Sequence, residues 1–150
     1  MIVRDAALTD LSAVAALEAE LFGSDAWSSD IVREELTGER RRYIVLVDEA
    51  GTIRGYAGIL VVGTDGDIQT IAVDPGLRGA GHGRALMNEL LDEAARRGAS
   101  QVFLEVRADN PVARGLYISL GFVEIGVRPR YYQPEGVDAI VMQLQLKDRQ

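Results

Sequence analysis

The chain has 150 residues, 47% of them hydrophobic and 26% charged, which is ordinary for a soluble globular protein and predicts one domain over residues 1–150. It has no cysteine and one histidine, His82, which excludes disulfides, a thiol nucleophile, thiolate zinc sites and multi-histidine sites, so no metal is expected. The net charge of −7 argues against direct nucleic-acid binding, and no apolar run approaches the roughly 20 residues of a membrane span.

The first quarter of the chain predicts two helices. The opening residues, MIVRDAALTDLS, lack the apolar run and cleavage site of a signal peptide, so we expect a cytoplasmic protein. TDLSAVAALEAELF (9–22) offers Thr9 as an N-cap, and SSDIVREELTG (28–38) offers Ser28. The residues spaced to face the core are Leu11, Val14, Leu17 and Leu21 in the first helix and Ile31, Val32 and Leu36 in the second.

The rest of the chain alternates predicted strands and helices. Strands are expected at 43–48 and 53–62, joined by the turn EAGT, and at 68–75, where Pro75 ends the strand. A helix follows a glycine-rich stretch and stops near Gly98. The remaining elements are a strand at 102–106, a helix at 110–121, and strands at 122–127 and 138–146 that are separated by RPRYYQPEGV.

The order of these elements predicts an α/β fold built on a mixed sheet. The central strand–helix–strand unit implies at least one parallel pair with a right-handed crossover. The hairpins at both ends imply antiparallel pairing. We therefore expect a mostly antiparallel, twisted sheet with helices on both faces.

The stretch RGAGHGRALMNELLDEAARRG (78–98) places Gly79, Gly81 and Gly83 directly before a helix. A helix N-terminus presents unpaired N–H groups and a partial positive charge, and bare glycines let an anion approach them. The stretch lacks the Lys-Ser/Thr of a Walker loop and departs from the dinucleotide spacing GxGxxG. It predicts either a tight turn without a ligand or, given an arginine at each edge, the site of an anionic cofactor.

The pattern Arg-x-x-Gly-x-Gly at 78–83 resembles the acetyl-CoA pyrophosphate loop of the GNAT N-acetyltransferases. The strand before it, TIAVDP, and the order of elements along nearly the whole chain are also similar to that family. The resemblance implies a GNAT-type fold whose central strand pair splays apart, with acetyl-CoA as the cofactor and its thioester in the gap. The residues that it assigns to the cofactor are Ile71, Ala72, Val73, Arg78, Gly79, Ala80, Gly81, His82, Gly83, Arg84, Asn110 and Tyr117.

A second segment narrows the resemblance. LEVRADNPVARGLYISLGF (104–122) is similar to the segment that marks the ribosomal-protein-alanine N-acetyltransferase (RimI) branch, as are RYY with DAIVMQL, and AWS at 26–28. This branch implies acetyl transfer to the N-terminal α-amino group of a protein, with the N-terminal alanine of a small-subunit ribosomal protein as the acceptor. The implied partner is a basic N-terminal segment, which an acidic chain suits, and a monomer or weak dimer is expected.

Glu105 is the candidate general base. It lies mid-strand in VFLEV, where Val102, Leu104 and Val106 take one face and leave Glu105 on the other. An unpaired charge is costly in a strand, so the residues alone allow a solvated glutamate, a partner of Arg107, or a proton acceptor. The resemblance implies the last of these, because in the GNAT family this position accepts the proton of the amine, directly or through water.

Tyr117 is the candidate general acid. It follows Asn110, which caps a helix with Pro111 at its first position, and the residues alone favour a core tyrosine with its hydroxyl at the surface. The resemblance implies instead that the hydroxyl lies beside the thioester sulfur and protonates it. It also implies that Asn110 contacts the pantetheine arm and that the backbone of 71–73 holds the acetyl and pantetheine groups.

The acceptor side is predicted from the aromatic residues. Trp27, Arg130, Tyr131 and Tyr132 are the candidates for lining the acceptor groove, and the alternative is that the rings are buried against the sheet. Two other functions stay open at this point. One is an N-acetyltransferase for lysine side chains or small amines, and the other is a non-catalytic acyl-CoA sensor that uses the glycine loop only for binding.

Overall fold

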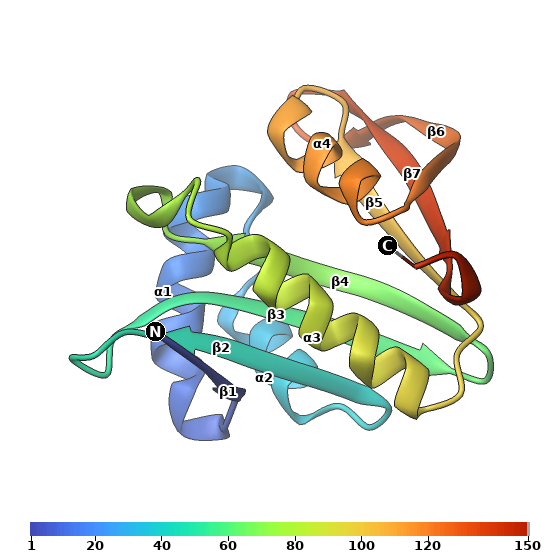
Figure 1. The fold of residues 1–150 in the computed structure, drawn as a ribbon. Coiled ribbons are helices and arrows are strands. Elements are labelled where there is room, and N and C mark those ends of the chain that lie inside the picture. Colours follow the sequence, from blue (N-terminus) through green and yellow to red (C-terminus); the bar gives the residue numbers. More distant parts are fainter. Residues whose placement is uncertain (150) are drawn as a thin grey trace.

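The computed structural model describes residues 1–149, which form one seven-stranded sheet with helices packed against it (Figure 1). In chain order the elements are β1 (Ile2–Asp5), α1 (Leu11–Phe22), α2 (Ser29–Thr37), β2 (Arg41–Val47), β3 (Ile53–Val62), β4 (Asp65–Val73), α3 (His82–Arg96), β5 (Gln101–Arg107), α4 (Pro111–Ser119), β6 (Val123–Tyr132) and β7 (Val137–Gln145).

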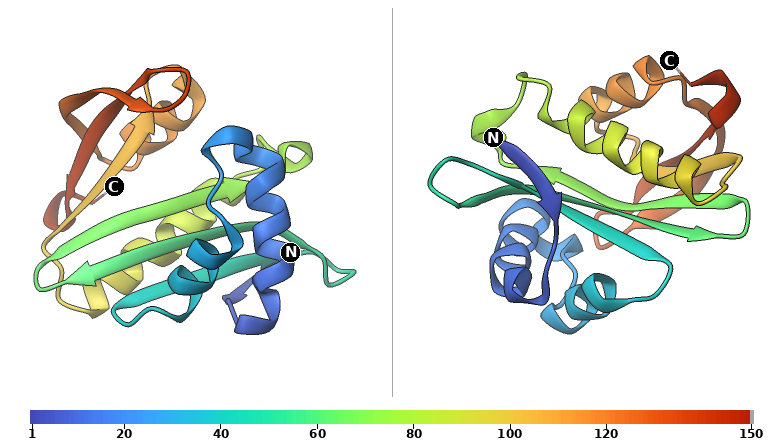
Figure 2. Two further views of the ribbon diagram at one scale, coloured as in Figure 1. Left: turned by 180° about the vertical axis from the view of Figure 1, so that it is seen from behind. Right: turned by 60° about the horizontal axis from the view of Figure 1, so that its bottom comes forward.

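The strands follow the order β1-β2-β3-β4-β5-β7-β6 across the sheet. β4 and β5 run parallel, and each other neighbouring pair is antiparallel. Helices α1 and α2 cover one face of the sheet and α3 covers the other (Figure 2). The predicted mixed, mostly antiparallel α/β fold is therefore confirmed. Within residues 1–149, none of the helices is long and apolar enough to cross a membrane.

The parallel pair separates soon after it starts. Its register joins residues 65–67 of β4 to residues 101–103 of β5, at the beginning of each strand. Beyond these residues the two strands diverge, which the left view of Figure 2 shows. The sheet therefore opens toward the C-terminal ends of β4 and β5, as the GNAT resemblance implied.

Apolar side chains fill two cores, one on each face of the sheet. The larger core lies under α3 and α4, and the smaller one lies under α1 and α2. The spacing of the apolar residues in α3 predicts an inner face of six residues. One of them, Ala95, is exposed, and the other five are fully buried in the larger core. They are Leu86, Met87, Leu90, Leu91 and Ala94.

The prediction of Thr9 as an N-cap is wrong. α1 begins at Leu11 after a short 3-10 turn, and the Asp10 carboxylate accepts the Ala7 N–H at 2.7 Å. Asp10 also pairs with Arg4 at 2.8 Å, and this contact holds the pKa of Asp10 below its usual value. Arg4 lies in β1, a strand missing from the prediction because four mostly exposed residues carry little periodic signal.

The predicted inner face of α2 is partly wrong. Val32 is buried, but Ile31 is 43% exposed and the buried neighbour is Glu35 instead. The Glu35 carboxylate accepts the Tyr43 hydroxyl at 2.6 Å and pairs with Arg41 at 2.9 Å. A buried carboxylate with two such partners is satisfied, so the helix can turn this side to the sheet.

The predicted loop over residues 128–137 is also wrong. β6 continues through Tyr132, and only residues 133–136 connect it to β7. The pairing of β6 with β7 is irregular between Arg128 and Tyr132. β6 is the edge of the sheet, where Pro129 is tolerated because one side of the strand needs no ladder hydrogen bonds.

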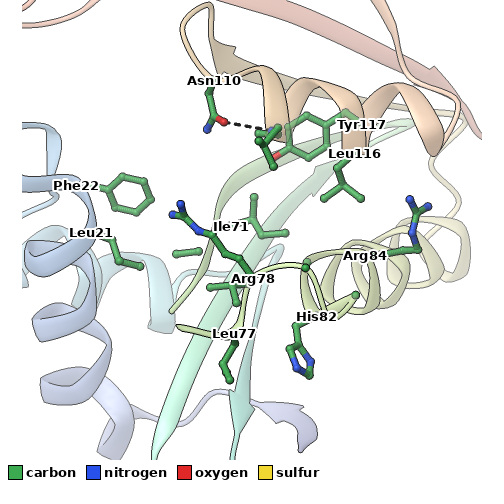
Figure 3. A pocket seen from close by; sticks show the side chains of 17 residues that line it. Leu21, Phe22, Ile71, Leu77, Arg78, His82, Arg84, Asn110, Leu116 and Tyr117 are labelled. Carbon is green, nitrogen blue, oxygen red and sulfur yellow. Dashed lines mark hydrogen bonds between the residues drawn. The ribbon is translucent and has the colours of Figure 1, made fainter. Parts of the chain in front are cut away.

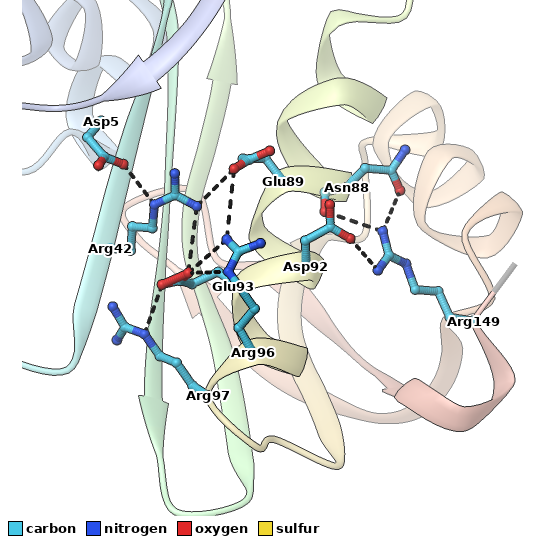
Figure 4. A network of polar contacts seen from close by, with 9 residues as sticks. All are labelled: Asp5, Arg42, Asn88, Glu89, Asp92, Glu93, Arg96, Arg97 and Arg149. Atoms are coloured by element: carbon cyan, nitrogen blue, oxygen red, sulfur yellow. Dashed lines mark hydrogen bonds and ion pairs between the residues drawn. The ribbon is translucent and has the colours of Figure 1, made fainter.

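Ion pairs connect α3 to the rest of the fold at two positions (Figure 4). Arg42 of β2 pairs with Asp5 of β1 at 2.8 Å and with Glu89 of α3 at 3.0 Å. Near the C-terminus, Arg149 pairs with Asp92 of α3 at 2.7 Å. These contacts connect the helix to segments near both ends of the described chain.

Candidate active site

A cavity of about 440 Å³ lies along the open end of the gap between β4 and β5. Its walls come from the end of α1, from β4, from the glycine loop with the first turn of α3, and from α4 (Figure 3). All the residues predicted to contact the cofactor line this cavity except Ala80, which lies in the loop outside the lining. The lining residues are Leu21, Phe22, Ile71, Ala72, Val73, Leu77, Arg78, Gly79, Gly81, His82, Gly83, Arg84, Asn110, Val112, Ala113, Leu116 and Tyr117.

Sequence reasoning missed the apolar part of this lining. These residues lie at the end of α1, in the turn after β4 and on α4, where their spacing signals only a core face. One signal appears in the structure alone: Val112 is 79% exposed although it is a large apolar residue. The residues missed are Leu21, Phe22, Leu77, Val112, Ala113 and Leu116.

The shape of the loop before α3 depends on glycine. Gly79 and Gly81 have φ angles of +86° and +83°, where a side chain is strained, and nothing lies within 4 Å of a Cβ at either position. Gly81 is the N-cap of α3. Because glycine has no side chain, it offers no side-chain acceptor to the N–H groups of the first turn. The loop therefore leaves open space at a helix N-terminus, where a negative charge is stabilised.

The charged side chains of the loop point in different directions (Figure 3). Arg78 is exposed and extends toward Phe22. Arg84 turns toward α4, where its Nη2 donates a hydrogen bond to Ser119 Oγ at 2.6 Å. The imidazole of His82 points away from the cavity-facing side of α4. Arg78 is thus the cation placed to meet an anion in the cavity, whereas Arg84 joins α3 to α4.

Tyr117 is buried at the cavity wall, where it is 6% exposed and meets Phe122 edge-on with ring centroids 6.1 Å apart. Burial raises the pKa of Tyr117, so its hydroxyl stays protonated at neutral pH. Asn110 fixes the start of the same helix, because its Oδ1 accepts the Ala113 N–H at 3.2 Å. A protonated hydroxyl at the cavity wall is suited to act as a proton donor.

Glu105 lies on the face of β5 that points away from the larger core. The alternation predicted for this strand is confirmed, because Val102, Leu104 and Val106 are buried and the Glu105 side chain is 31% exposed. The partner of Glu105 is Arg128 of β6, with 3.2 Å between Oε1 and Nε. Glu105 is absent from the lining of the cavity, and it lies on β5 beyond the residues that pair with β4.

Arg107 is held by other residues, so it is not the partner of Glu105. Its guanidinium pairs with Asp25 in the loop between α1 and α2, and with Asp109, where Nε and Oδ1 are 3.0 Å apart. It also lies 5.2 Å from the centre of the Tyr132 ring. The pKa of Tyr132 rises to about 12, first through burial and then through the negative charge of Glu105.

The structure brings the two predicted acceptor-side tyrosines together. Tyr131 and Tyr132 meet edge-on with ring centroids 5.1 Å apart, and Tyr131 is 48% exposed. Arg130 precedes them in a strained conformation, with φ at +54° and its N–H bonded to Asp138 at 2.9 Å. Tyr132 therefore stands near Glu105, with Tyr131 on the solvent side.

Trp27, by contrast, packs against the smaller core. Its backbone N–H donates to the Glu18 carboxylate at 3.0 Å, and that carboxylate also accepts the Tyr56 hydroxyl. Glu18 is 3% exposed and so fixes the loop between α1 and α2 on the sheet. The structure thus places the Trp27 side chain, partly buried, against the smaller core, and its role in lining the acceptor groove stays a prediction.

The sequence and the fold both match known acetyltransferases. The pattern of the acetyltransferase (GNAT) family matches residues 11–122. N-alpha-acetyltransferase RimI of Mycobacterium tuberculosis is 44% identical over 138 residues, which cover 89% of this chain and 85% of that protein. The crystal structure of the ribosomal-protein-S18-alanine N-acetyltransferase of Escherichia coli has a TM-score of 0.88 at 36% identity, covering 97% of this chain and 93% of that one.

A third relative is longer than this chain. An uncharacterized protein of Mycobacterium leprae is 43% identical over 138 residues, and this match spans 89% of the chain but 37% of the relative. The family assignment rests on the first two matches, which extend over most of both proteins. The chain belongs to the GNAT family of acetyltransferases, in its ribosomal-protein-alanine N-acetyltransferase (RimI) branch.

Proposed function

We propose that this protein transfers the acetyl group of acetyl-CoA to the N-terminal α-amino group of a ribosomal protein, with the N-terminal alanine of bS18 as the acceptor. The observation that carries the proposal is the two-sided gap between β4 and β5. The glycine loop and Tyr117 border it from the cavity, and Glu105 borders it from the opposite strand. The name of the Escherichia coli relative, a ribosomal-protein-S18-alanine N-acetyltransferase, supports the choice of acceptor. The name of the Mycobacterium tuberculosis relative, an N-alpha-acetyltransferase, supports transfer to an α-amino group.

Acetyl-CoA fits the residues around the cavity. Its pyrophosphate is an anion, which the first turn of α3, the open space at Gly79 and Gly81, and the guanidinium of Arg78 would stabilise. The apolar walls from α1 and α4 suit the pantetheine chain. The backbone of residues 71–73 pairs with β3 but not with β5, so the polar groups on its β5 side are available to the cofactor. When bound, the cofactor supplies an acetyl thioester, whose sulfur leaves as a thiolate.

Two side chains divide the proton transfers between them. Only a neutral amine is a nucleophile, so Glu105 accepts the proton of the α-ammonium group, directly or through water. Tyr117 keeps its proton at neutral pH and supplies it to the leaving sulfur. A backbone N–H of residues 71–73 polarises the acetyl carbonyl, because a fixed donor aimed at developing negative charge lowers the barrier.

Gly81→Asp is expected to weaken acetyl-CoA binding by at least about tenfold, because it adds a like charge and a strained side chain beside the pyrophosphate. Isothermal titration calorimetry measures the effect. Gly51→Asp is the matched control, since Gly51 has a φ of +82° and equally open space but lies in the turn between β2 and β3. It should lose stability and keep cofactor affinity. A folded Gly81→Asp protein with wild-type affinity would contradict the assignment of the loop.

Intact-mass analysis tests the acceptor directly. The protein is incubated with acetyl-CoA and basic peptides that start with Ala, Ser, Met or acetyl-blocked Ala and that carry an internal lysine. One acetyl group is expected on the alanine peptide and none on the blocked peptide. Acetylation of the blocked peptide would favour a lysine acetyltransferase. Binding of acetyl-CoA without transfer to any peptide or to a polyamine would favour a sensor.

A further inference from the structure

Two arginines stand near the candidate base, and they are held in different ways. Arg107 is engaged by Asp25 and Asp109, and 26% of its side chain is exposed. Arg128 lies on the edge strand β6 with 57% of its side chain exposed. Among residues 1–149, Glu105 is the charged group that pairs with Arg128. Arg107 is therefore held by two carboxylates, whereas Arg128 pairs with a single carboxylate.

Arg128 also contacts an aromatic ring while it pairs with Glu105. Its guanidinium carbon lies 5.7 Å from the centre of the Tyr131 ring, which is within the range of a cation–π contact. Tyr131 is itself 48% exposed, so a guanidinium that leaves Glu105 can stay on the ring or turn toward water without entering the core. Because an ion pair this exposed is weak, another cation can replace Arg128 on Glu105 at little cost.

We propose that Arg128 is a displaceable counter-ion that takes the place of the acceptor's α-ammonium group on Glu105 while the acceptor is absent. The inference rests on the proposed function, since it requires a cationic amine that must reach Glu105. Both cations are attracted to the same carboxylate, so they compete for it. A guanidinium suits this position because it stays protonated at every physiological pH and gives Glu105 no proton.

This competition makes Arg128 a residue that lowers the affinity for the acceptor's amine. The acceptor's terminal amine has to replace the guanidinium of Arg128 before Glu105 can take a proton from the amine. The free energy needed for this replacement lowers the binding affinity of every acceptor amine. Loss of an ordinary binding residue weakens binding. Loss of a competing cation strengthens it, so the sign of the change separates the two roles.

The experiment measures the binding of an alanine-starting basic peptide to the full chain saturated with CoA. Arg128→Gln is expected to bind the peptide roughly two- to fivefold more tightly than wild type, the range expected for an exposed ion pair, and its KM for the acceptor should fall by the same factor. Arg128→Lys keeps the cation and should stay close to wild type. Arg114→Gln removes another guanidinium from the same half of the fold, where it pairs with Glu124, and should leave acceptor binding unchanged.

A second peptide tests whether the effect depends on the positive charge of the terminal amine. It carries a propionyl group in place of the first alanine, so it has the same shape without the ammonium group. Arg128→Gln should not tighten the binding of this analogue, and the preference for the amine over the analogue should rise two- to fivefold. Thermal unfolding and CoA affinity show that each variant is folded, and Arg128→Ala repeats the test with a second uncharged residue.

The outcomes separate this inference from the proposed function. Unchanged or weaker binding of the amine peptide by folded Arg128→Gln and Arg128→Ala overturns the counter-ion role. Equal tightening of both peptides also overturns it, because the effect would then be steric. If wild type acetylates none of the peptides, the proposed function fails and the inference falls with it. Normal wild-type acetylation with no tightening in the variants overturns the inference alone.

Discussion

Replacement of Tyr117 by phenylalanine is expected to lower kcat by roughly 10²–10⁴-fold, the usual contribution of a general acid. The change removes one oxygen from a side chain that is 6% exposed, so the packing against Phe122 is kept. Burial raises the pKa of Tyr117 and keeps its proton in place at neutral pH. Without this hydroxyl the sulfur has to leave without the proton that Tyr117 supplies. Acetyl-CoA affinity should change little.

Tyr43→Phe is the matched control for Tyr117→Phe. It also removes the hydroxyl of a buried tyrosine, but that hydroxyl donates to Glu35 at 2.6 Å beneath α2 and lies outside the cavity lining. This variant should unfold at a lower temperature and keep its kcat, because a hydrogen bond to a buried carboxylate contributes to stability and not to the reaction. Steady-state kinetics and thermal unfolding of both variants distinguish the roles. Full activity of Tyr117→Phe would make Tyr117 a core tyrosine only.

Glu105→Gln is expected to lower the rate at neutral pH by roughly 10²–10⁴-fold and to recover part of it in alkali. The acceptor's α-amino group has a pKa of about 7.7–8.0, so its neutral fraction rises about six- to tenfold between pH 7 and pH 9. A variant without a base depends on this fraction. Its pH–rate profile below saturation should therefore climb more steeply than that of wild type on the same alanine-starting peptide.

Glu124→Gln is the control for the loss of a carboxylate in the same half of the fold. Glu124 is on β6, pairs with Arg114 and has 41% of its side chain exposed, so its profile should follow that of wild type. If the profile of Glu105→Gln also coincides with that of wild type, Glu105 is not the base. A low rate for Glu105→Gln at every pH, with no alkaline recovery, would indicate a role in binding the amine rather than in taking its proton.

The sequence by itself determined the features that depend on neighbouring residues. The glycines before α3, the cap and proline that open α4, and the alternation of β5 are local patterns, and each predicted the right element. The strand–helix–strand order predicted at least one parallel pair, and β4 and β5 form such a pair. Composition excluded disulfides and thiolate metal sites. The family resemblance added the splay of the central strands and the named residues of the cofactor site.

The tertiary structure decided which distant residues meet. Glu105 pairs with Arg128, which is 23 positions away in the chain, and not with the nearby Arg107. The pairing of the strands in the sheet brings the side chains of Glu105 and Arg128 to the same face. The apolar residues of α1 and α4 that line the cavity have ordinary core spacing, and only the divergence of β4 from β5 exposes them. Edge position explains why residues 128–132 extend β6 although their composition resembles a loop. In each case the structure depends on a contact between segments that are far apart in the chain. Hydrophobic periodicity reports only on neighbouring residues, so it cannot predict such contacts, which depend on tertiary packing.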